Sequence, residues 1–274
     1  MSAAQWVVTV SQVLNLLVST GMVYIGIAAL AIIGITTVAL YLMGRPNEIW
    51  DFIDEVVNYL AIIGGVILAI AIVNKVLVGS LTIDPVTVYK TIYDYAWNAV
   101  RFRAWLLWNT CTCPLTYPWC DVRGGVQTEN ATLILESTED IVPMIYLAQW
   151  TPGLSALLIA MGLGLSVSRL RGIGSLFIAI GLGLYVVIVG GAAVIASQPF
   201  YVAMINDKGI QAIINPVNFE TTWCENVGIS VSGLGNVLSA YNRLAVYIAQ
   251  ADTIVIILYA LLFAVIYAIR SAFS

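Results

Sequence analysis

The chain of 274 residues has no histidine, and only 9% of its residues are charged. Histidine is the commonest general acid or base and the usual protein ligand of zinc and haem. We therefore expect a protein that is not an enzyme and that binds no metal or other cofactor. The 11 Lys and Arg residues form no basic tract. Bulk electrostatic binding to phosphate or to anionic lipid is therefore not expected either.

Apolar residues, in contrast, make up 61% of the chain. A soluble domain of this length cannot bury so much apolar surface, because much of its chain must face water. The composition therefore predicts a membrane protein. The first charged residue is Arg45, so the N-terminus lacks the positive region of a signal peptide, and we expect it to belong to the mature protein.

Five charge-free stretches are long enough, or nearly so, to cross the hydrocarbon of a bilayer as helices. They predict an all-α polytopic membrane bundle, a single membrane domain over residues 1–274. The third stretch starts earlier, near Ile145, if Pro152 only kinks the helix. The five stretches are Met22–Met43, Val56–Asn74, Gly153–Ser168, Ile173–Ala196 and Thr253–Ile269.

Short connections rich in Lys and Arg remain on the cytoplasmic side of membranes. Arg169 and Arg171 share a short turn that contains no acid, which predicts that this turn is cytoplasmic. The connection around Arg45 and the C-terminus are then cytoplasmic as well. The N-terminus, a large insertion at 80–150 and a second segment at 198–252 lie outside the cell membrane.

All four cysteines and one glycosylation sequon fall in the two predicted outer segments. Disulfides persist on that side of a membrane, so we expect one or two structural disulfides, and four cysteines allow three pairings. The alternatives, a redox thiol or a tetrathiolate metal site, lack an activating histidine and the C-x-x-C spacing. The residues concerned are Cys111, Cys113, Cys120 and Cys224, with Asn130 as the glycosylation candidate.

Three further segments have helical periodicity. The aromatic segment Val86–Trp108 is typical of a helix at the lipid boundary or packed against the bundle; its interleaved arginines leave a nucleic-acid stacking platform as the alternative. Residues Val231–Ile248 run without a break into the fifth stretch, which predicts one long helix. Residues Gln5–Thr20 predict an amphipathic helix that leads into the first stretch after Gly21.

Small residues recur within the stretches and predict close helix packing. The tetrapeptide Gly-Leu-Gly-Leu occurs at Gly162 and again at Gly181. We interpret it as packing chemistry on two neighbouring helices; the alternative is the internal duplication of a transporter. No stretch contains a charged residue, which disfavours a charge-coupled carrier and favours a subunit that packs against other membrane proteins.

This layout of an outer N-terminus, five spans, a large outer insertion, an arginine turn and an inner C-terminus resembles one known family. It is similar to the polytopic channel subunit of type IV secretion and conjugation machines, in particular its archaeal DNA-import (Ced) branch. The resemblance implies a multi-subunit complex with other membrane subunits, a pilin and a cytoplasmic ATPase, with DNA as cargo. Residues 84–140 hold seven acids against four bases, a balance that argues against direct contact with DNA.

Three other functions remain open from the sequence. Glycine-broken spans suit a small-solute transporter or channel. The absence of charge in the bilayer suits a structural subunit of another membrane complex, such as a viral envelope or a respiratory complex. The four cysteines leave a membrane thiol oxidoreductase as the last alternative.

Overall fold

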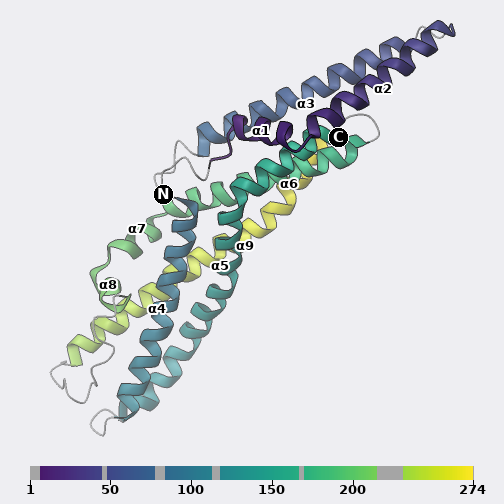
Figure 1. Ribbon diagram of the computed structural model, residues 1–274. Coiled ribbons are helices and arrows are strands. Elements are labelled where there is room, and N and C mark those ends of the chain that lie inside the picture. Colours follow the sequence, from purple (N-terminus) through teal and green to yellow (C-terminus); the bar gives the residue numbers. More distant parts are fainter. Residues whose placement is uncertain are drawn as a thin grey trace. The chain divides into compact units, whose positions relative to one another are not determined.

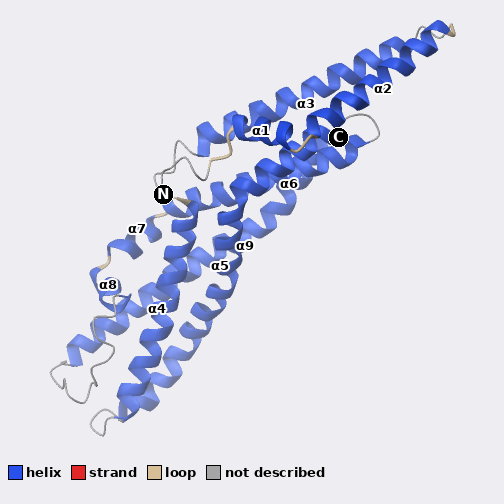
Figure 2. Cartoon of the chain, in the orientation of Figure 1, coloured by secondary structure: helices blue, strands red, loops and turns tan. Residues whose placement is uncertain are grey.

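The fold is known from a computed structural model that describes residues 7–44, 48–77, 84–112, 118–166, 170–214 and 231–273. All regular structure in these ranges is helical (Figure 2), which confirms the all-α class. The helices are α1 (Val10–Ser19), α2 (Met22–Leu42), α3 (Glu48–Leu77), α4 (Pro85–Thr112), α5 (Pro118–Leu165), α6 (Arg171–Ser197), α7 (Pro199–Asn206), α8 (Lys208–Ile214) and α9 (Val231–Phe273).

Four of these helices are long and apolar enough to cross a membrane: α3, α5, α6 and α9. The second, fourth and fifth predicted stretches therefore lie where expected. The third starts before Gly153, as expected for the case in which Pro152 does not end the helix, because α5 continues through Pro152. Membrane helices tolerate proline when neighbouring groups satisfy the freed backbone.

The first predicted stretch, Met22–Met43, coincides with α2, which runs over Met22–Leu42 without a charged residue. The predicted helix before it is present as α1, which begins after a capping box on Thr9 and Gln12. Gly21 joins the two helices with a φ of 75°, a left-handed conformation that glycine adopts at little cost. The long C-terminal helix is confirmed, since α9 runs for 43 residues.

The chain forms two compact units. Unit 1 contains residues 1–84, 147–190 and 258–274, and unit 2 contains residues 85–146 and 191–257. Helices α5, α6 and α9 each contribute residues to both units. The segments of α5 and α6 within unit 1 are about 30 Å long at 1.5 Å per residue, the thickness of a bilayer core.

In unit 1, α5 and α6 pack antiparallel through glycines. A Cβ on Gly162 would stand 2.7 Å from the carbonyl oxygen of Gly174, and one on Gly181 would stand 2.9 Å from that of Ser155. Backbones this close exclude any side chain between them. The two Gly-Leu-Gly-Leu segments thus lie on neighbouring helices, as the packing interpretation predicted.

Helices α1 and α2 follow each other along α3 in the opposite direction (Figure 1). Three contacts set the register. Asn74 Nδ2 donates a hydrogen bond to the carbonyl oxygen of Val8 at 2.9 Å. Further along, Gly26 lies against Tyr59, and Gly34 lies against Phe52. On the spacing of these contacts along the antiparallel helices, Gly21 lies level with Gly64.

In unit 2, α4 buries one face against its neighbours. That face includes Tyr89, Ile92 and Ala99, all with no exposed surface. Tyr93 and Trp97 stack on each other outside it, with ring centroids 6.5 Å apart. The short helices α7 and α8 contact each other, and α8 also contacts α4.

Candidate functional site

The structure describes little of the residues that the sequence predicts to form disulfides or to be glycosylated. Cys113 and Cys224 lie outside the described residues. Cys111 belongs to α4, and Cys120 and Asn130 belong to α5, but only the backbone of these three residues is described. Cysteine pairing and glycosylation therefore stay predictions.

Charged residues define where a hydrocarbon layer can enclose unit 1. On α3, Asp54 and Glu55 precede the uncharged stretch Val56–Asn74, and Lys75 follows it. This stretch is about 28 Å long, close to the thickness of a bilayer core. Because a charge in the bilayer costs several kcal/mol, we expect the hydrocarbon to lie along this part of α3.

On the placement expected from α3, the same layer encloses only part of the antiparallel partner. Val8 is level with Asn74, and the residue level with Val56 lies about one turn beyond Gly26. We therefore expect the enclosed segment to consist of α1, the break at Gly21 and the first two turns of α2. The remainder of α2 is then expected beyond the layer, together with the acidic start of α3.

Helix α5 agrees independently with this boundary. The carbonyl oxygen of Gly164 stands 3.8 Å from the Cβ position of Gly26. Just beyond it, α5 ends at Leu165, and α6 starts again at the charged residue Arg171. The end of α5 at Leu165 thus lies near the first turns of α2.

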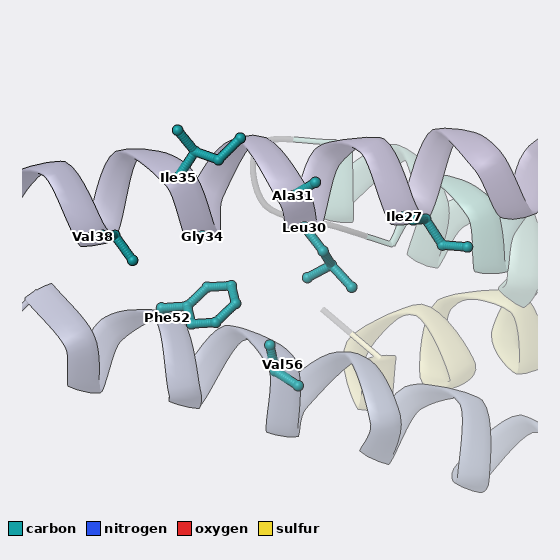
Figure 3. Close-up of a pocket in the computed structure, with 8 residues that line it drawn as sticks. All are labelled: Ile27, Leu30, Ala31, Gly34, Ile35, Val38, Phe52 and Val56. Atoms are coloured by element: carbon teal, nitrogen blue, oxygen red, sulfur yellow. The ribbon is translucent and has the colours of Figure 1, made fainter.

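An apolar groove of about 650 Å³ runs between α2 and α3 at this end. Leu30 points toward α3, while Phe52 and Val56 point toward α2 (Figure 3). Ile35 and Val38, also at the groove, are 71% and 58% exposed. Most of the groove lies at or beyond the level of Val56, so its apolar surface faces water unless a partner covers it.

A second cavity, of about 520 Å³, separates α1 from α5. Gln12, Asn15 and Ser19 supply polar side chains from α1, and Pro152 and Gly153 form part of the opposite wall. These groups are all uncharged. Because Pro152 has no N–H, the carbonyl of Ala148 lacks its usual helical donor at this wall.

One buried polar contact joins three segments of unit 1. The Tyr185 hydroxyl of α6 donates to Asn74 Oδ1 of α3, and Asn74 donates in turn to Val8. The amide side chain thus uses both its acceptor and its donor, as buried polar groups require. This contact fixes the start of α1 against α3.

In unit 2, Asp207 ties the junction of α7 and α8 to α9. Its Oδ1 accepts the backbone N–H of Gly209 at 2.8 Å, and its Oδ2 accepts Arg243 Nε at 2.9 Å. Partial burial acts to raise the pKa of Asp207, but hydrogen bonds from Ile210, Arg243 and Gly209 outweigh it, so the pKa is lowered.

Two tyrosines near this junction are held neutral. Burial raises the pKa of Tyr95, although a hydrogen bond from Gln211 Nε2 at 2.6 Å partly offsets it. Burial also raises the pKa of Tyr201, with partial compensation by a hydrogen bond involving Thr91. These contacts hold α7 and α8 on α4 and do not form a catalytic arrangement.

Among the residues whose positions are described, no three His, Cys, Asp or Glu side chains are grouped to hold a metal ion. Comparison of the chain with known protein families, with curated proteins and with solved structures found no match. No related protein therefore adds to the structural features of the site.

Sequence reasoning missed both cavities. The groove forms only in the register that α2 and α3 adopt against each other. No local sequence pattern contains that register. The cleft had a weaker signal, because Ser11, Asn15 and Ser19 recur every four residues in an uncharged helix, and Pro152 with Gly153 interrupts the pattern of α5.

Proposed function

We propose that this protein is a membrane subunit of a DNA-transfer machine, in which it scaffolds the translocation path and docks a partner subunit through the α2–α3 hairpin. The observation that carries the docking part is the apolar groove beyond the charged boundary of α3. Apolar surface that is neither in lipid nor in a protein core marks an interaction site.

The partner surface follows from the chemistry of the groove. Its apolar walls include Phe52 and Val38, and Asp54 on α3 is exposed nearby. A complementary partner presents apolar side chains with a basic rim. The resemblance to type IV secretion channel subunits implies a cytoplasmic ATPase on the side of the arginine turn, and we assign the groove to that protein.

The assignment to DNA transfer depends on the layout of spans and on the lack of charge in the membrane part. Residues 56–74, 147–165, 172–190 and 258–269 contain no charged residue. A carrier driven by an ion gradient normally has charged residues in its membrane part. A scaffold within a larger assembly needs no charged residues there.

A deletion strain tests the two parts of the proposal separately. Loss of DNA import on deletion, with recovery on re-expression, is expected; normal import in the deletion strain contradicts DNA transfer. Val38→Asp in the groove is expected to abolish co-purification of the ATPase and import. Leu42→Asp, on the same helix outside the groove lining, serves as the matched control and is expected to preserve both. Co-purification that survives Val38→Asp contradicts the docking site.

A further inference from the structure

On the membrane placement expected from α3, helices α1 and α2 together cross the bilayer with a break near its middle. The break at Gly21 lies level with Gly64, and Gly64 is the midpoint of the apolar part of α3, Phe52–Val76. At the break the helical ladder stops, because the N–H of Gly21 bonds to the carbonyl of Val18, three residues back, at 3.1 Å. Helix α2 therefore does not continue the hydrogen-bond ladder of α1.

Pro152 and Gly153 of α5 face the first half of this span and form one wall of the cleft whose other wall is α1. Helix α5 continues through both residues, but proline removes one helical hydrogen bond and leaves the carbonyl of Ala148 without its usual donor. Irregular backbone at membrane depth, such as the break at Gly21, is tolerated where it is buried in protein or lines a water-filled cavity.

The side chains of the cleft define what it can hold. Asn15 offers an amide donor and an amide acceptor. Gln12 offers its amide N–H groups, because its Oε1 accepts the backbone N–H of Thr9 at 3.0 Å, and the Ser19 hydroxyl, which donates to the carbonyl of Leu16, offers an acceptor. No lining side chain is charged, so an ionic solute would be desolvated without compensation. The volume of about 520 Å³ also far exceeds the roughly 30 Å³ that one water molecule occupies in the liquid. An ion alone would leave most of the cleft empty.

We infer that the cleft between α1 and α5 is a binding site for a small uncharged solute that carries several hydroxyl groups and enters from the aqueous phase. Hydroxyl groups donate and accept at once, which matches the amide and hydroxyl groups of the α1 wall. The inference is independent of the docking groove and of DNA transfer.

Thiol labelling in proteoliposomes tests the inference on the full-length protein. Asn15→Cys places a thiol in the cleft, and Val18→Cys places one at similar depth on the 55% exposed side of α1 away from it. Because only a hydrated thiolate reacts, a membrane-impermeant methanethiosulfonate reagent is expected to modify Asn15→Cys at least about tenfold faster than Val18→Cys. The unsubstituted protein provides the background from the native cysteines.

Protection then identifies the ligand class. Mannitol in the buffer is expected to slow the modification of Asn15→Cys about twofold at a concentration equal to its dissociation constant. Sodium chloride is expected to have no effect beyond ionic strength, and monoolein in the bilayer is expected to have none. Equal reactivity of the two variants, protection by sodium, or protection by monoolein alone would each overturn the inference. Ser19→Cys repeats the test if Asn15→Cys lowers the thermal stability of the protein.

Discussion

The ring of Tyr59 on α3 ends against Gly26 on α2, so closely that a Cβ on Gly26 would stand 2.8 Å from the Tyr59 hydroxyl oxygen. This contact and the one between Gly34 and Phe52 set which residues of α2 lie beside which residues of α3. The acids of α3 then predict which part of the uncharged N-terminal segment lies in lipid, so charge on one helix predicts the position of the membrane on its neighbour.

The close approach of α5 and α6 predicts a large effect of a single methyl group. Gly162→Ala forces backbone apart at a site where the nearest carbonyl stands 2.7 Å from the new Cβ. We expect a loss of about 1–3 kcal/mol in unfolding free energy, read as a lower midpoint of thermal unfolding in detergent. Gly64→Ala is the control, because nothing lies within 4 Å of its Cβ position. An unchanged midpoint for Gly162→Ala would show that the two helices do not touch there.

The hydrogen bonds of Asn74 predict a graded series. Tyr185→Phe removes one bond, and Asn74→Leu removes that bond and the bond to Val8. Hydrogen bonds between membrane helices contribute on the order of 0.6–2 kcal/mol, so Asn74→Leu is expected to cost more than Tyr185→Phe. Tyr267→Phe, at a ring that is 75% exposed, is the control. A double-mutant cycle that gives no coupling between positions 74 and 185 contradicts the contact.

The lowered pKa of Asp207 predicts a loss of stability in acid. A carboxyl whose pKa is lower in the folded than in the unfolded state stabilises the fold above its ordinary value of 3.8. That stabilisation is lost as the pH falls from this value through the folded pKa. Asp207→Asn is expected to weaken the junction of α7 and α8 at neutral pH and to flatten the pH dependence below 3.8, as measured by hydrogen exchange of α8. An unaltered acid profile in this variant would refute the role of the carboxylate.

A pair of aspartate substitutions tests the placement of the membrane. Leu68 and Ile35 are similarly exposed, at 61% and 71%, but only Leu68 lies within the proposed hydrocarbon layer. Leu68→Asp is expected to impair insertion by about 2.5–3.5 kcal/mol, whereas Ile35→Asp inserts normally. The yield of membrane-integrated protein measures both. Equal impairment by the two substitutions would place α2 in the bilayer along its whole length.

Local patterns predicted the helices well, whereas the position of the membrane on them stays a prediction. The stretch Ile173–Ala196 matches α6 within two residues at each end, because charge and turn residues bound it on both sides. The first stretch matches α2 within one residue, but no charge occurs before Arg45, so nothing local predicts its depth. The third stretch had two possible starts, because Pro152 usually ends a helix in water, whereas α5 continues through it. The cleft and the groove depend on contacts between distant residues, which no window of sequence contains.

The depth of two spin labels in lipid vesicles measures the central claim most directly. Labels on Val18→Cys and Ile35→Cys report how often each label collides with oxygen and with a polar nickel chelate. Oxygen concentrates in hydrocarbon, whereas the chelate stays in water. The account predicts that oxygen dominates at Val18, near the membrane centre, and that the chelate dominates at Ile35. Oxygen dominance at Ile35 together with chelate dominance at Val18 would contradict the broken span and the exposed hairpin together.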